Sequence, residues 1–220
     1  MGFTRQIFDK ALEELQQEIL RMGSLVEQAI HEAVQSMAQQ DVALAEKVMA
    51  ADNFIDQLEL DIEDKCTKLI ATQQPMARDL RKIGTGIRII TDLERMGDHA
   101  FDIAKTTLRL ANDPLIKPLI DIPRMAGLAQ KMVKDSLDSY VHLDVELARK
   151  MCADDDKVDE IYSYIFDELI GIMEKDPSTV YQATHLLFVA RYIERIADHA
   201  TNIGEAVIYL VTGVRKELNL

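Results

Sequence analysis

Carboxylate side chains recur in this chain in pairs that are spaced to share one face of a helix. The pairs are Asp52/Asp56, Glu94/Asp98, Asp155/Asp159 and Glu194/Asp198. Residues four positions apart lie one above the other on a helix, so each pair would present two carboxylates to the same neighbour. Carboxylate clusters without thiolates are the ligand sets that hard cations such as Mg²⁺, Mn²⁺, Ca²⁺ or iron prefer. The spacing therefore predicts metal binding.

These pairs are parts of a long internal repeat. The segment ERMGDHAFDI at Glu94–Ile103 matches ERIADHATNI at Glu194–Ile203, and Asp41–Asp56 matches Asp144–Asp159. Self-similarity at a fixed spacing indicates a duplicated structural unit. We therefore expect two similar halves, each with its own acidic site.

Proline positions and apolar periodicity predict the helices. Proline is poorly tolerated inside a helix, and the five prolines leave long proline-free segments. Within those segments apolar residues recur at the i, i+3, i+4, i+7 spacing of an amphipathic helix. The predicted helices are 5–40, 42–72, 76–111, 122–142, 145–173 and 178–215. The predicted fold is all-α, with two tandem antiparallel three-helix bundles at 1–112 and 124–220 and a proline-rich linker at 113–123.

The positions of the acidic pairs predict that they meet across a helical hairpin. Asp56 and Glu94 are equally distant from Pro75 along the chain, and so are Asp52 and Asp98. In a tight antiparallel hairpin such residues come to the same level. The second half repeats this relation about its own proline, so we expect four carboxylates to meet in each half. Crowded like charges are costly unless protons or cations compensate them.

Neighbouring side chains leave alternatives to metal binding. Arg95 and Arg195 directly follow the motif glutamates and could neutralise carboxylates across the bundle, in a purely structural helical scaffold. His99 and His199 lie on another face of their helices, so we expect them to hydrogen-bond within the bundle. A zinc site would need one of them as a ligand. A ferritin-like di-metal oxidase typically uses Glu-x-x-His on facing helices, whereas here histidine directly follows aspartate.

Composition and charge exclude several function classes. The formal net charge is −13 and no cluster of Lys and Arg occurs, which argues against binding of nucleic acid. Cys66 and Cys152 form no C-x-x-C motif and are expected to be free thiols in a reducing cytosol. The chain shows no signal peptide and no long apolar run, so we expect a cytoplasmic protein that does not span a membrane. Neither a glycine-rich phosphate loop nor paired arginines suggest direct recognition of phosphate.

The chain resembles the PhoU family of bacterial phosphate-transport and phosphate-signalling regulators from end to end. The most specific segments are Gln74–Arg81, Asp92–Ala100 and Tyr192–Glu205. The resemblance implies two similar three-helix bundles, frequent homodimers, and metal ions such as iron or zinc held by the eight carboxylates named above, with manganese or magnesium as further candidates. One departure, Ala197 in place of Gly97, is expected to be harmless. Another, Asn202 in place of Asp102, makes the two sites unequal in charge.

The same resemblance implies a regulatory function rather than an enzymatic one. The resemblance implies an adaptor that connects a phosphate ABC transporter, through its ATPase, to a membrane sensor histidine kinase. They suppress phosphate uptake and the phosphate-starvation response when phosphate is plentiful. Contact with the membrane would then occur only through these partners.

Overall fold

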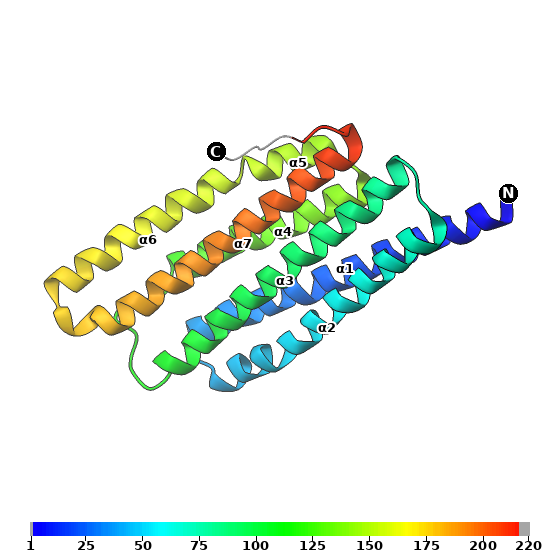
Figure 1. The fold of residues 1–220 in the computed structure, drawn as a ribbon. Helices are drawn as coiled ribbons and strands as arrows, with labels where there is room; N and C mark the ends of the chain where they lie inside the picture. Colours follow the sequence, from blue (N-terminus) through cyan, green and yellow to red (C-terminus); the bar gives the residue numbers. More distant parts are fainter. Residues whose placement is uncertain (1, 216–220) are drawn as a thin grey trace.

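The computed structural model describes residues 2–215, and within that range every regular element is helical (Figure 1). The elements are α1 (Gly2–Gln39), α2 (Val42–Gln73), α3 (Arg78–Leu110), α4 (Asp121–His142), α5 (Val145–Cys152), α6 (Asp155–Lys175), the short 3₁₀ helix η1 (Pro177–Thr179) and α7 (Val180–Thr212). The predicted all-α fold class is confirmed.

The helices form two antiparallel bundles that stand side by side. In the first bundle α1, α2 and α3 pack on one another, and in the second α4 and α7 pack with α5 and α6. The centre of the molecule is occupied by α3 and α7, which pack against each other, while α1 packs against α4 (Figure 1). An irregular segment, 111–120, connects the bundles. The domain limits at 112 and 123 stay predictions.

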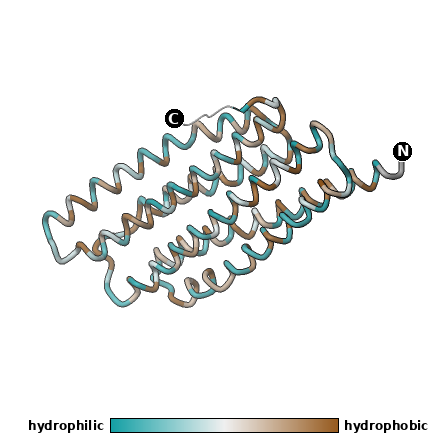
Figure 2. Tube along the Cα trace, in the orientation of Figure 1, coloured by the Kyte–Doolittle hydropathy of each residue, from teal (hydrophilic) through white to brown (hydrophobic). Residues whose placement is uncertain are grey.

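Amphipathic patterning drives this packing. Hydrophobic and hydrophilic residues recur in turn along each helix (Figure 2), as expected for helices with one apolar face. The buried apolar side chains form one core that runs through both bundles. Removal of apolar surface from water is the main favourable contribution to such a fold. No described helix combines the length and the apolar composition needed to cross a membrane.

The same type of turn opens the second helix of each bundle. Leu143 adopts a left-handed conformation with a φ of 54°. The backbone N–H of the next residue, Asp144, donates to the carbonyl of Ser139 at 2.9 Å, which closes α4. The Asp144 side chain then accepts a hydrogen bond from the Leu147 N–H at 2.9 Å and caps α5. Gln40–Asp41 repeats this arrangement between α1 and α2.

The predicted continuous helix at 145–173 is wrong, because a turn at Asp154 separates α5 from α6. The repeat places Ala51 at the equivalent position of the first half, where α2 is continuous. Alanine favours a helix more than aspartate does. The Asp154 carboxylate is also held by Lys131 of α4 at 3.2 Å and by Lys157 at 2.6 Å. These contacts stabilise the turn that the repeat did not predict.

Replacement of Asp144 by alanine should lower the free energy of unfolding by about 1 kcal/mol, because the side chain caps the backbone of α5. Urea denaturation followed by circular dichroism measures the change. The matched control is Glu146→Ala, which removes a carboxylate from the same turn where the side chain is 90% exposed. That variant should stay within about 0.5 kcal/mol of the parent. Equal losses in the two variants would contradict the capping role.

Candidate functional site

The first acidic site lies between α2 and α3. Asp52 and Asp56 extend from α2 and Asp98 from α3, and one oxygen of each carboxylate lies within 4.8 Å of the other two. All three side chains are half-buried. In the part of the chain that the structure describes, no other group of three potential metal-ligating side chains converges as closely. The structure thus brings together three of the four carboxylates expected at this level.

The fourth carboxylate, Glu94, is engaged by an arginine of its own helix. Arg95 Nε lies 3.3 Å from Glu94 Oε2, and Arg95 Nη1 lies 3.0 Å from Asp98 Oδ2. Arg95 therefore neutralises the acids of α3 and does not reach a carboxylate across the bundle, which was the alternative. With its side chain 57% exposed, it can leave these contacts at little cost.

Crowding raises the pKa of the carboxyl groups in this site. Burial raises the pKa of Asp52 to about 6, and repulsion by Asp56 and Asp98 contributes to the shift. Burial also raises the pKa of Glu94 to about 7, with Asp98 adding to the effect and Arg95 opposing it. The site therefore retains protons near neutral pH in the absence of a compensating cation.

Gly97 lets the two helices of this site approach closely. A Cβ atom at this position would lie 3.3 Å from Ile55 Cγ2 and 3.5 Å from Asp52 Oδ1. The first of these separations is tighter than ordinary van der Waals contact, so the Ile55 side chain would have to move by a few tenths of an ångström. The second repeat carries Ala197 at this position. The difference between Gly97 and Ala197, which was expected to be harmless, therefore lies where the helix that carries Asp98 approaches the helix that carries Asp52.

The second acidic site, between α6 and α7, is more buried and less convergent. Asp155 and Glu194 are 5% and 9% exposed. Burial raises the pKa of Asp155 to about 7, and repulsion by Asp159, Asp198 and Glu194 adds to it. All four carboxylates therefore interact, although among the described residues no three of them converge as closely as those of the first site.

Two arginines of α7 occupy the second site. Arg191 pairs with Glu194 one helical turn away, and Arg195 Nη1 lies 2.8 Å from Asp198 Oδ2. Arg191 also acts across the bundle, because its charge opposes the rise in the pKa of Asp159 on α6. The other oxygen of Glu194, Oε2, is buried without a hydrogen-bond partner. Arg191 was not among the predicted site residues, although its i,i+3 spacing from Glu194 is a signal for this ion pair.

The two motif histidines lie at the contact between the bundles and not at the acidic sites. His199 Nδ1 pairs with Asp92 Oδ1 of α3 at 2.9 Å, and Asn202 donates to the same oxygen at 3.1 Å. His99 stacks on Tyr192 with ring centroids 5.7 Å apart, and its Nδ1 is buried without a hydrogen-bond partner. Burial lowers the pKa of His99 to about 4. The expected hydrogen bonds within one bundle are thus replaced by contacts between bundles.

The donor set of the first site fits a hard cation. Three carboxylate oxygens from two helices converge, and neither thiolate nor imidazole belongs to the group. Oxygen ligands of this kind suit Mg²⁺, Mn²⁺, Ca²⁺ and iron. A zinc site with a histidine ligand gains no support, and neither does a Glu-x-x-His oxidase site, because both imidazoles face the other bundle.

Comparison with known proteins agrees with this architecture. A family model described as the PhoU domain matches residues 19–107 and 122–207, once in each repeat. A phosphate-specific transport system accessory protein PhoU homolog of Clostridium acetobutylicum is 46% identical over 217 residues, which cover 98% of this chain and 99% of the relative. The corresponding homolog of Aquifex aeolicus is 45% identical over 204 residues, covering 93% of this chain and 92% of the relative.

Solved structures show the same fold. The crystal structure of PhoU from Pseudomonas aeruginosa superposes with a TM-score of 0.91 at 35% identity, covering 94% of this chain and 100% of that one. The crystal structure of the phosphate transport system regulatory protein PhoU from Streptococcus pneumoniae gives a TM-score of 0.90 at 32% identity, covering 96% and 100%.

The raised carboxyl pKa values predict a particular pH dependence of stability for the metal-free chain. Asp52 is protonated in the folded state up to about pH 6, but in the unfolded state only below its ordinary value of 3.8. Its contribution to stability is therefore present at low pH and lost as the pH rises through 6. The low pKa of His99 acts in the opposite direction, because stability is lost as the pH falls from 6.5 towards 4.

Asp52→Asn isolates the carboxyl contribution. In chelator, the variant should melt a few degrees higher than the parent at about pH 8, where Asp52 carries an uncompensated charge, and the difference should shrink as the pH falls and vanish only below 3.8. Differential scanning calorimetry measures the difference. Asp61→Asn removes a charge from the exposed face of the same helix and should show no pH-dependent gain. A lower melting temperature of Asp52→Asn at about pH 8 would refute the repulsion described above.

Proposed function

The chain belongs to the PhoU family, and from this premise we propose that it is a metal-binding regulator of phosphate transport. In this proposal it acts in the cytoplasm as an adaptor between the ATPase of a phosphate ABC transporter and a membrane sensor histidine kinase. It would restrain phosphate uptake and the phosphate-starvation response when phosphate is plentiful. The observation that carries the proposal is the likeness to phosphate-specific transport system accessory proteins over almost the whole chain.

The acidic character of the chain supports action through protein contacts. The net charge of −13 suits a basic surface on a partner, and contacts of that kind weaken as salt increases. Large apolar side chains are also exposed on the outer helices, among them Phe54 and Leu60 on α2 and Tyr164 on α6. Aromatic side chains such as Phe54 and Tyr164 are enriched at protein interfaces.

The carboxylates would hold the metal. Asp52, Asp56 and Asp98 are the proposed ligands in the first repeat, and Glu94 is near enough to join them electrostatically. In the second repeat, binding would use Asp155, Asp159, Glu194 and Asp198. A bound cation supplies the positive charge that cancels repulsion among these groups.

Arginine contacts make the two sites unequal. Arg191 and Arg195 already compensate Glu194 and Asp198 in the second repeat, whereas Arg95 alone compensates the acids of α3 in the first. The first site therefore has more uncompensated negative charge and the closer oxygen set. We expect it to bind a divalent cation more tightly than the second.

Metal binding predicts a pH-dependent gain in stability. Mn²⁺ in excess over its Kd should raise the melting temperature of chelator-treated protein at about pH 8, by an amount that corresponds to about 2.7 kcal/mol at a hundredfold excess. At about pH 5 the gain should shrink, because protons compete for the same carboxylates. The double variant Asp52→Asn/Asp98→Asn should lose most of the gain, with a matching loss of metal measured by mass spectrometry after equilibration.

Gly97→Ala provides a geometric test of the same site. The added Cβ pushes on Ile55 and touches Asp52 Oδ1, so the variant should bind Mn²⁺ more weakly while it stays folded. Ala197→Gly is the matched change in the second repeat and should not weaken binding to the first site. Unchanged metal content in both Asp52→Asn/Asp98→Asn and Gly97→Ala would show that these carboxylates are not the metal ligands.

Regulation is tested in a strain that lacks this chain. A reporter of a phosphate-starvation promoter should be active in phosphate-rich medium, and the parental chain should restore repression. An affinity-tagged chain should capture the transporter ATPase and the kinase, with less recovery at high salt. Normal repression in the deletion strain, together with no capture of either protein, would overturn the adaptor proposal.

A further inference from the structure

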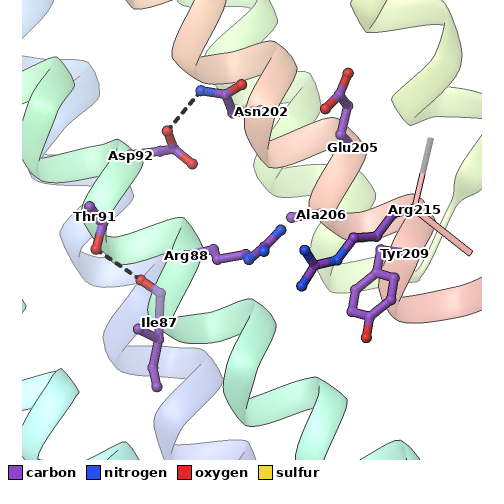
Figure 3. Close-up of a pocket in the computed structure, with 9 residues that line it drawn as sticks. All are labelled: Ile87, Arg88, Thr91, Asp92, Asn202, Glu205, Ala206, Tyr209 and Arg215. Atoms are coloured by element: carbon purple, nitrogen blue, oxygen red, sulfur yellow. Dashed lines mark hydrogen bonds between the residues drawn. The ribbon is translucent and has the colours of Figure 1, made fainter. Parts of the chain in front are cut away.

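A hollow of about 610 Å³ lies between α3 and α7, on faces that the acidic sites do not use. Figure 3 shows its lining, to which both repeats contribute. Small-molecule sites in proteins are concave and range over about 300–1,000 Å³. The volume is therefore sufficient for a small organic ligand and exceeds the needs of a single ion.

Two arginines face each other inside this hollow. Arg88 extends from α3, and Arg215 follows the end of α7 at Gly213. Their guanidinium groups point towards one another (Figure 3). Both side chains are exposed, and in the part of the chain that the structure describes neither forms an ion pair. Arg215 is instead positioned over the ring of Tyr209, 5.3 Å from its centroid.

In the described part of the chain, the acidic residues of the lining form no ion pair with the two arginines. Asp92 is engaged by His199 and Asn202, at 2.9 and 3.1 Å. The Glu205 carboxylate is turned away from the two guanidinium groups (Figure 3), and its charge contributes to the raised pKa of the Cys152 thiol. Two guanidinium groups that face each other repel unless an anion lies between them.

We propose that this hollow binds a phosphate group between Arg88 and Arg215, either as free inorganic phosphate or as the phosphate of a small phosphoester. Each guanidinium offers a fork of N–H donors that matches two oxygens of a phosphate. A phosphate carries a charge of about −1.5 to −2 at neutral pH and enough oxygens for both forks. A carboxylate has one charge and two oxygens, which satisfy a single fork.

The remaining walls would accept the organic part of a phosphoester. Ile87 and Ala206 provide apolar surface and Tyr209 provides an aromatic ring. Thr91 and Asn202 are already committed as donors, to the Ile87 carbonyl and to Asp92. The arginines are therefore the groups that would recognise the ligand, and the other side chains shape its surroundings.

The internal repeat does not duplicate this hollow. The position equivalent to Arg88 is Phe188 and that equivalent to Tyr209 is Arg109. One ligand per chain is therefore expected, and it would connect α3 of the first repeat to the segment after α7 of the second. The inference goes beyond the proposed regulatory function, because it concerns direct binding by the isolated chain and needs neither transporter nor kinase.

Titration of the full-length chain, in chelator and at low ionic strength, tests the proposal. Inorganic phosphate and AMP are the two probes, followed by calorimetry and by the arginine Nε–H signals in nuclear magnetic resonance spectra. Saturable binding of either probe is expected, with shifts of the Arg88 and Arg215 signals. Equal affinity for both probes would show that the phosphate group alone accounts for binding. Tighter binding of AMP would show that the ligand is a phosphoester whose organic part also contacts the hollow.

Variants assign the binding to this hollow. Arg88→Gln or Arg215→Gln should each weaken binding about tenfold or more, and the double variant should abolish it. Arg88→Lys keeps the charge without the fork and should give an intermediate loss. Arg124→Gln removes an exposed arginine of α4 outside the hollow and should bind like the parent. All affected side chains are exposed, so the melting temperature should not change.

Three results would overturn the proposal. The first is the absence of saturable binding of both probes up to about 10 mM. The second is unchanged affinity in the double arginine variant. The third is competition by acetate as effective as that by phosphate, which would show that the arginine pair does not select a phosphate group. None of these results bears on the adaptor proposal, which is tested in cells and by capture of the partner proteins.

Discussion

α3 and α7 pack against each other through many apolar side chains together with the His199–Asp92 pair, and their acidic motifs lie on other faces. One of these faces meets α2 or α6 and carries the acidic motif. Another meets solvent at the edge of the contact, where Arg88 lines the hollow. The arrangement of both candidate sites therefore depends on a single helix–helix contact.

The duplication has left two units that share a fold but differ in chemistry. Gly97 brings Asp52 close to α3, whereas Ala197 occupies the equivalent place in the second repeat. Arg191 compensates Glu194, and its equivalent, Thr91, carries no charge. Both differences weaken the second site as a place for a cation and strengthen it as a network of ion pairs. One unit is thus better suited to bind metal, and the other is better suited to stay folded without it.

The carboxylates lower the stability of the chain that contains them. Their raised pKa values result from burial and from mutual repulsion, both of which disfavour the charged form. Such groups lower the stability of the metal-free protein at neutral pH unless a proton or a cation compensates. Perturbed pKa values in a shared site are a common property of functional residues, although structural networks show them as well. Here the convergence of three oxygens adds an independent geometric reason.

The sequence by itself determined the helical fold, the duplication and the pairing of acidic motifs, because helix periodicity and proline positions are local properties. It did not predict the turn at Asp154, since the lysine of α4 that holds this residue is distant in sequence. Nor did it indicate that Arg88 and Arg215 would face each other, because no spacing rule relates residues in different repeats. Contacts of that kind are decided by the way whole helices pack, and only the tertiary structure shows them.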